Sequence, residues 1–219
     1  MFHYIFTISL YVCIIGIAVA TRFAQATPLY NTDDAQITSE KSCQFEMNQL
    51  FNTSDTQFIL NPACTLKNVE LSLPITYGGK DTLYAAQLKH PLYLSDTFGI
   101  AMSGMYQPSQ YNLTSLWTVN LPLSFYHVYS DLQLDVNIGW YQENHHQSDL
   151  SWSIAATKPI TERQKIGLEY YKQPPEQEKI QAVWSIDVVP DKTSLYLSYG
   201  QSIRSSVSHW FGIGLSFAI

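Results

Sequence analysis

The stretch from Trp210 to Ile219 constrains the fold more than any other part of the chain. Read as an extended strand, it separates large apolar side chains from small ones. One face carries Phe211, Ile213, Leu215, Phe217 and Ile219, and the other carries Gly212, Gly214, Ser216 and Ala218. Such a strand fits a closed membrane β-barrel, because lipid covers the apolar face and pairing of the last strand with the first leaves no open edge.

Similar alternation recurs along the chain, most regularly between Leu132 and Tyr141. We expect about twelve antiparallel strands in an up-and-down transmembrane barrel, with roughly ten or fourteen as alternatives, because segment boundaries carry an error of about 2 to 4 residues. The segments are residues 43–51, 57–64, 69–77, 82–94, 98–106, 113–125, 132–141, 150–157, 165–172, 182–188, 194–199 and 210–219.

The connections between these segments alternate in length. If both ends of the barrel domain lie on the periplasmic side, turns after even segments are short and loops after odd segments are longer. Residues 65–68 and 189–192 are tight and follow even segments, whereas residues 52–56, 107–112, 143–149 and 173–179 are longer and follow odd ones. Residues 78–81 depart from this rule, since they are short where a loop is expected.

The composition agrees with a membrane barrel. Charged residues and aromatic residues each make up 14% of the chain, and the mean hydropathy is −0.08. Few charges with neutral hydropathy result from alternating apolar and small polar residues and argue against a helical membrane protein. The aromatic residues Tyr77, Trp140, Tyr170 and Trp210 suit interfacial girdles. A secreted β-sandwich is the alternative fold, but it usually places more charge on its exposed sheet faces.

The N-terminal region divides into two parts before the barrel. An apolar run from Ile5 to Ala20 followed by Ala24-Gln25-Ala26 predicts a cleaved signal peptide over residues 1–26, with an uncleaved anchor as the alternative. Residues 27–42 are polar and follow neither structural period, so we expect a free tail, with a partial plug of the barrel mouth as the alternative. The barrel then comprises residues 43–219.

Two cysteines, Cys43 and Cys64, remain after the leader. In an exported chain this pair predicts a structural disulfide. The net charge is −6 and the basic residues are dispersed, which argues against nucleic acid as a partner. The sequence predicts no cofactor.

The acidic residues of the polar strand faces are the candidate functional groups. We expect Glu46, Glu70, Asp135, Asn137, Glu169 and Asp187 to line the lumen. Acids around a narrow pore favour cations and repel anions. The alternative is that these groups pair with interior polar residues and form a packed core, because small barrels are readily filled by side chains.

Catalytic and metal sites find little support in the sequence. His145 and His146 are adjacent in a loop and lack the spacing of a metal site. Ser208 and His209 are also adjacent, so their side chains point to opposite faces, and His127 has no strand-spaced serine. No G-x-S-x-G motif is present. We therefore expect neither catalytic residues nor a bound metal.

Short motifs give the chain a resemblance to a known family. They are Asp33-Asp34-Ala35, Asn61-Pro62-Ala63-Cys64, Gly139-Trp140, Val189-Pro190-Asp191 and the run Trp-Phe-Gly-Ile-Gly-Leu that begins at Trp210. The mature chain resembles small proteobacterial outer-membrane β-barrels labelled putative transporters, of the phenol-degradation MetA-pathway type. This resemblance implies an outer-membrane location and passage of small, hydrophobic or aromatic compounds.

We expect a passive or weakly selective channel in the outer membrane of a Gram-negative bacterium, with lipid and a small-molecule permeant as partners. Trp210 to Ile219 is the expected signal for the barrel-assembly machinery, although such barrels commonly end in Phe and this chain ends in Ile219. A closed structural or interaction barrel is the alternative, and an outer-membrane hydrolase is a third, less favoured one.

Overall fold

The computed structural model describes residues 29–53, 55–78, 81–110, 115–143, 148–172, 178–204 and 208–219. The predicted signal peptide lies outside the described residues. Every regular element within these residues is a β-strand. No helix in the described part of the chain is long and apolar enough to span a membrane.

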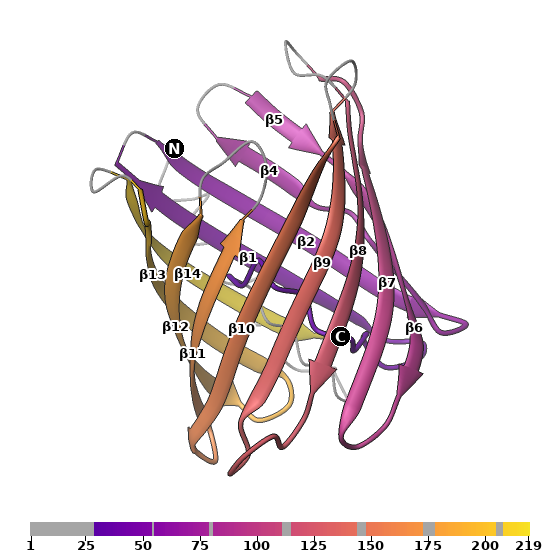
Figure 1. Ribbon diagram of the computed structural model, residues 1–219, viewed down its shortest axis with the longest axis vertical. Coiled ribbons are helices and arrows are strands. Elements are labelled where there is room, and N and C mark those ends of the chain that lie inside the picture. The colour runs from indigo at the N-terminus through magenta and orange to yellow at the C-terminus, as the bar shows by residue number, and fades with distance from the viewer. Residues whose placement is uncertain are drawn as a thin grey trace, which may run out of the picture.

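Fourteen β-strands in the described residues form one antiparallel sheet that closes on itself (Figure 1). From β6 to β14 each strand pairs with the next one in the chain, and β1 pairs with both β2 and β14. The strands are β1 (Cys43–Asn52), β2 (Thr56–Leu66), β3 (Val69–Ser72), β4 (Ile75–Gly78), β5 (Asp81–Tyr84), β6 (Ala86–Leu94), β7 (Phe98–Gln107), β8 (Leu116–Phe125), β9 (Gln133–Glu143), β10 (Asp149–Thr161), β11 (Gln164–Lys172), β12 (Lys179–Val189), β13 (Thr193–Ser202) and β14 (His209–Ala218).

The barrel wall nevertheless has twelve strand positions, because two of them are interrupted. β3 and β4 both pair with β2 in one continuous register, and β5 and β6 continue one another in the same way. The interruption lies at Pro74, which has no N–H to donate to the ladder. Its carbonyl still accepts a hydrogen bond from the Ala85 N–H at 2.9 Å. The predicted up-and-down barrel of about twelve strands is confirmed.

Closure occurs between the first and last strands. Along this seam Phe45 stacks on Phe217, with ring centroids 5.3 Å apart, and Phe51 lies beside Phe211. These rings belong to the outer face, where large apolar side chains are exposed all around the barrel. Lipid is the solvent that such a surface requires. The small face of β14, with Gly212 and Gly214, points inward and is buried.

The two ends of the barrel differ in their connections. Turns of two or three residues join β2 to β3, β6 to β7, β10 to β11 and β12 to β13 at what we call the short-turn end. In the turn after β2, Lys67 and Asn68 have φ angles of 51° and 61°, as a tight two-residue hairpin requires. Longer loops lie mostly at the opposite, long-loop end. Outer-membrane barrels keep short turns on the periplasmic side, so we expect the long-loop end to face outward from the cell.

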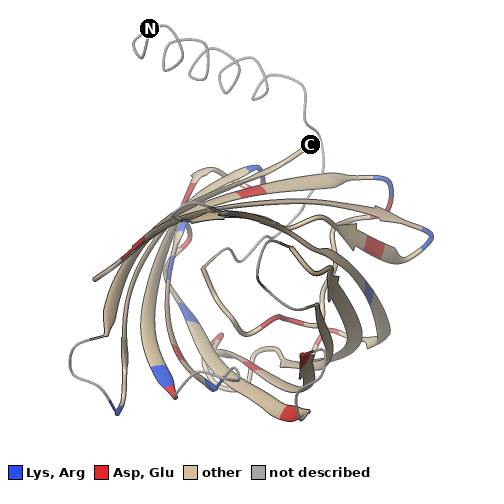
Figure 2. Cartoon of the chain, turned by 90° about the horizontal axis from the view of Figure 1, so that it is seen from above, with Lys and Arg blue, Asp and Glu red and all other residues tan. Residues whose placement is uncertain are grey.

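Residues 29–42 run inside the barrel, and we call them the inner segment. Figures 1 and 2 show this chain within the ring of strands. Leu29, Thr32, Ala35 and Thr38 are all buried. The segment leads directly into β1, where Cys43 is bonded to Cys64 as the predicted disulfide.

One sequence expectation for the aromatic girdles is wrong. Tyr77 and Trp140 are exposed on the outer face, but Trp210 is only 7% exposed and points into the barrel. Its ring lies across Gly200, where an added Cβ would be 2.1 Å from the indole Cζ2. Trp210 lies on the same inward face of β14 as Gly212 and Gly214. The alternation of side chains along the strand therefore decides its direction, although it lies near the end of a segment.

Candidate functional site

The interior of the barrel is polar, and its strongest contacts are with the inner segment. Glu169 of β11 is 1% exposed. Its carboxylate accepts hydrogen bonds from the Thr32 N–H, from Thr32 Oγ1 at 2.6 Å and from the Gln181 side chain. Gln181 also donates to the Leu29 carbonyl at 2.7 Å. Glu169 and Gln181 therefore hold the start of the inner segment against β11 and β12.

A second anchor comes from β8 and β9. Ser124 Oγ accepts a hydrogen bond from the Ala35 N–H at 2.8 Å and donates to Asp135 Oδ1 at 2.6 Å. Asn137 faces the Asp33 backbone. With its amide oriented to satisfy both partners, it donates to the Asp33 carbonyl at 2.7 Å and accepts from the Asp33 N–H at 2.6 Å. This wall thus pairs with the backbone of the segment much as a neighbouring strand would.

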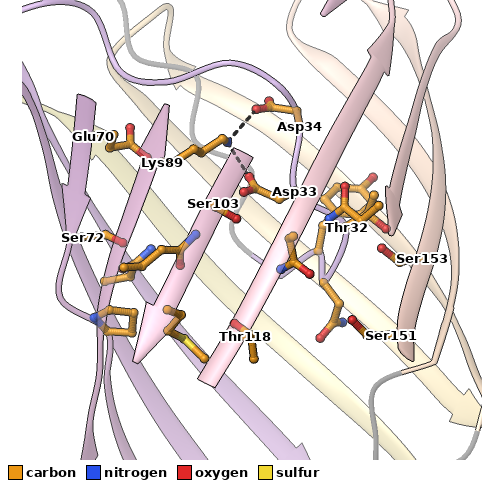
Figure 3. A pocket seen from close by; sticks show the side chains of 18 of the residues that line it. Thr32, Asp33, Asp34, Glu70, Ser72, Lys89, Ser103, Thr118, Ser151 and Ser153 are labelled. Atoms are coloured by element: carbon orange, nitrogen blue, oxygen red, sulfur yellow. Dashed lines mark hydrogen bonds and ion pairs between the residues drawn. The ribbon is translucent and has the colours of Figure 1, made fainter. Parts of the chain in front are cut away.

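The third anchor is an ion pair on β6. Lys89 is 5% exposed, and its Nζ lies 2.6 Å from Asp33 Oδ1 and 3.4 Å from Asp34 Oδ1 (Figure 3). Next to it, Glu70 Oε2 accepts a hydrogen bond from the Thr38 N–H at 2.8 Å. A buried ammonium needs such compensation, because an unpaired charge in the interior is costly.

The last residues of the inner segment are hydrogen-bonded to a turn at the short-turn end of the barrel. The Glu40 carboxylate accepts hydrogen bonds from the N–H groups of Lys67 and Asn68, at 2.9 and 3.0 Å. The bond from Asn68, followed by that from Lys67, lowers the pKa of Glu40 below its ordinary value. Glu40 therefore stabilises the tight β2–β3 turn.

Glycines make room for the segment on the wall. A Cβ added at Gly167 would lie 1.7 Å from the Tyr30 hydroxyl oxygen, and one added at Gly99 would lie 2.8 Å from the Ala35 Cβ. At Gly214 the nearest Leu29 atom would be 3.2 Å away. The wall carries glycines where the inner segment packs against it. The sequence of the strands therefore specifies the position of the inner segment.

Two cavities remain inside the barrel beside the inner segment, of about 480 and 540 Å³. The first is lined by residues 30–34 and 36–38 together with inward side chains of β1 to β3 and β6 to β10 (Figure 3). The second lies toward β12 and β14 and includes Lys179 and Trp210. Both are bordered by Glu46 and Asn61, so they adjoin one another at β1 and β2.

The six residues predicted to line the lumen fall into three groups. Glu46, Glu70 and Asn137 border the first cavity. Asp135 and Glu169 do not border either cavity and anchor the inner segment, directly or through Ser124. Asp187 accepts a hydrogen bond from Ser194 Oγ at 2.6 Å, near the short-turn end. Their role in conduction stays a prediction.

Sequence reasoning missed Lys89 and its two partners in the inner segment. Lys89 occupies the inward register of its segment, between Gln87 and Pro91, and this position could have identified it. Asp33 and Asp34 carried no such signal, because the inner segment has no structural period. Their placement depends on contacts with strands far away in the sequence.

The histidines considered for catalysis or metal binding lie apart. His127 is exposed and pairs with Asp131 at 3.2 Å in the β8–β9 turn, whereas His209 begins β14 at the long-loop end and lies near Tyr199. His145 and His146 fall outside the described residues. Among the described residues, no group of three or more His, Cys, Asp or Glu side chains could hold a metal ion.

Solved structures with the same architecture are outer-membrane barrels. The KdgM porin has a TM-score of 0.67 at 12% identity, covering 80% of this chain and 98% of that one. The NanC porin has a TM-score of 0.63 at 12% identity, with 79% and 98% covered. The COG4313 outer membrane channel from Pseudomonas putida F1 has a TM-score of 0.57 at 12% identity, with 89% and 100% covered. At this identity the likeness concerns the fold.

Sequence comparison gives a family for the whole barrel. No significant match was found among curated proteins. The family described as "Uncharacterised conserved protein UCP029691" matches residues 14–219, which include the inner segment and every strand. The chain therefore belongs to this family.

Proposed function

We propose that this protein is a passive channel of the bacterial outer membrane, closed in its resting form by the inner segment, for small polar solutes. The apolar outer face supports a membrane location, since lipid must cover it. The polar inner face supports a path for water and polar solutes through the same wall.

The observation that carries the proposal is the pair of cavities inside the barrel. A barrel whose interior only holds the wall together is filled by side chains. Here a space of about 480 Å³ bordered by Asp33, Glu46 and Glu70 is left beside the inner segment. The inner segment is attached to the wall through hydrogen bonds and one cluster of ion pairs. Water can replace these contacts when the segment moves.

The charges around this cavity favour cations. Four carboxylates, those of Asp33, Asp34, Glu46 and Glu70, face the same cavity as the Lys89 ammonium. Rings of acidic side chains select cations over anions. One similar barrel, the KdgM porin, has been solved in complex with disordered oligogalacturonate, which is a polyanion. We infer a different class of permeant for this chain.

Hydrophobic or aromatic permeants, which the resemblance to MetA-pathway proteins implies, are the second candidate class. Polar side chains dominate the lining of the first cavity, and the apolar exceptions are Ile37, Pro74, Met105, Leu116 and Trp152. This lining supports polar solutes better than aromatic ones. Adding phenol to the conductance experiment below distinguishes the classes, because a bound aromatic permeant would block the ion current.

The test is single-channel recording of the purified protein in planar bilayers, compared with a variant that lacks residues 29–41. We expect small or rare conductance steps for the complete chain and larger, cation-selective steps for the deletion variant. The selectivity is read from the reversal potential in a KCl gradient. Absence of conductance in both forms, with heat-modifiable β-structure showing that both are folded, would favour the alternative of a closed structural barrel.

The outer face of β14 also remains our proposed recognition segment for the barrel-assembly machinery. Phe211, Ile213, Leu215 and Phe217 point outward along the seam with β1. Replacing Phe217 by Ser should reduce the amount of assembled barrel in membranes, while Phe125→Ser on β8 serves as a matched outward-facing control.

A further inference from the structure

Two carboxylates facing the first cavity have no cationic partner within the described residues. Glu46 Oε2 accepts a hydrogen bond from Asn61 Nδ2 at 3.0 Å, and Glu70 Oε2 accepts one from the Thr38 N–H. The ion pairs of the described chain involve neither of them. Both side chains are buried, at 9% and 8% exposure, so bulk water screens them little.

The cation within reach, Lys89, is already engaged by the inner segment. Its Nζ contacts Asp33 and Asp34, and Glu70 acts on it only as a further nearby negative charge. Lys172, at the edge of the cavity, lies 3.9 Å from Asp149. The cavity therefore keeps an excess of negative charge after its internal ion pairs are formed.

Amide oxygens without a hydrogen-bond donor, next to these carboxylates, give an independent sign of a missing donor. Asn48, two residues from Glu46 on the same inward face of β1, is 8% exposed and lines the second cavity. Its side-chain oxygen has no hydrogen-bond partner in the described residues, and the same is true of the side-chain oxygens of Gln44 and Asn61. Buried acceptors without donors are rare in native proteins and call for an explanation.

We propose that the first cavity, where it adjoins the second, binds a small organic cation through its primary ammonium group, with Glu46 and Glu70 as the charged partners. Gln44 and Asn61 supply neutral acceptors in this cavity, and Asn48 supplies one in the adjoining second cavity. This rests on the proposed channel function, because the ligand enters from the long-loop end. An ammonium carries three donors and one charge, which matches carboxylates flanked by amide oxygens.

The size of the site agrees with such a ligand. A cavity of about 480 Å³ lies within the range of about 300–1,000 Å³ that is usual for small-molecule pockets. Lys89 already shows the recognition chemistry inside the same cavity, since its ammonium is held by two carboxylates of the inner segment. A ligand ammonium at Glu46 and Glu70 would repeat this arrangement on the wall.

Isothermal titration calorimetry on the complete protein in detergent micelles at pH 7 tests the site. Three probes of equal chain length are compared: 1,4-diaminobutane, 1,4-butanediol and succinate. We expect the diamine to bind at least about tenfold more tightly than the neutral diol, because charged hydrogen bonds are stronger, and succinate to give no measurable heat. Equal binding of diamine and diol, or no binding of the diamine, would overturn the proposal.

Isosteric amide variants locate the binding site. Glu46→Gln and Glu70→Gln keep acceptors for Asn61 and Thr38, so the barrel and the inner segment retain these bonds. Each should weaken diamine binding about tenfold. Asp187→Asn, a change at an interior acid outside both cavities, should leave it unaltered. Unaltered affinity in Glu46→Gln, or the same loss in Asp187→Asn, contradicts the assignment.

Calorimetry also separates this inference from the channel function. Ion conductance without diamine binding would contradict the proposed binding site and support the channel function. Diamine binding without ion conductance would support the binding site and contradict the channel function.

Discussion

Single side chains hold the inner segment through buried polar contacts, and Lys89 is the most consequential of them. It is the shared partner of Asp33 and Asp34, and its own side chain is only 5% exposed. Removing one member of a buried ion pair is more damaging than replacing the whole pair, because the remaining charge is left without compensation.

Lys89→Met should therefore loosen the inner segment. Loss of a buried partner costs about 3–5 kcal/mol, enough to shift the segment out of the lumen and raise the open probability in bilayer recordings. Lys158→Met, which changes an exposed lysine, is the matched control and should record like the unaltered protein. Identical recordings from both variants would show that the ion pair does not hold the segment.

Glu40 gives a second prediction at this scale, with a defined direction in pH. Its folded pKa is lowered by the N–H groups of Asn68 and Lys67. The stabilisation is thus present above the pKa of the unfolded chain and is lost as pH falls through the lower folded pKa. In NMR titrations the amide proton of Asn68 should shift with a midpoint below the ordinary Glu value of about 4.3. Glu40→Gln should abolish that shift.

At the scale of elements, the strands could be predicted from the local sequence pattern, whereas the position of the inner segment could not. Alternation from Leu132 to Tyr141 places Asp135 and Asn137 inward, and the structure agrees with this register. The inner segment has no ladder and no period, so its position depends on partners such as Glu169, which lies 137 residues from Thr32. Trp210 was misplaced because the girdle pattern was given priority over strand parity.

The fit between wall and segment can be tested with one methyl group. Gly167→Ala would bring a Cβ to 1.7 Å from the Tyr30 hydroxyl oxygen, and overpacking of this kind costs about 1–3 kcal/mol. We expect Gly167→Ala to displace residues 29–31 and to increase proteolysis of the inner segment. At Gly104 an added Cβ would meet only the Thr118 carbonyl at 3.9 Å, so Gly104→Ala should be cleaved no faster than the parent.

For the whole molecule, closure of the barrel depends on pairing the first strand, β1, with the last strand, β14. The Cys43–Cys64 disulfide links residues separated by 21 positions and fixes β1 to β2 beside the seam with β14. In the chain-entropy description a loop of this size contributes about 3 kcal/mol by restricting the unfolded state.

The double variant Cys43→Ser, Cys64→Ser should accordingly unfold at lower urea concentration in lipid vesicles, with a free energy of unfolding lower by about 3 kcal/mol. The slope of the transition should change little if the folded barrel is the same. Reducing agent added to the unaltered protein should reproduce the shift. An unchanged midpoint in both cases would mean that strand pairing alone restricts this part of the chain.

The distribution of the anchors also has a consequence for the order of folding. The inner segment binds Lys89 on β6, Ser124 on β8 and Glu169 on β11, and these strands are brought around it only when the sheet has curved into a ring. Contacts between residues so distant in sequence form late. Insertion of the segment should therefore be the last step of assembly, and its protection from protease should appear after the β-sheet signal has reached its final value.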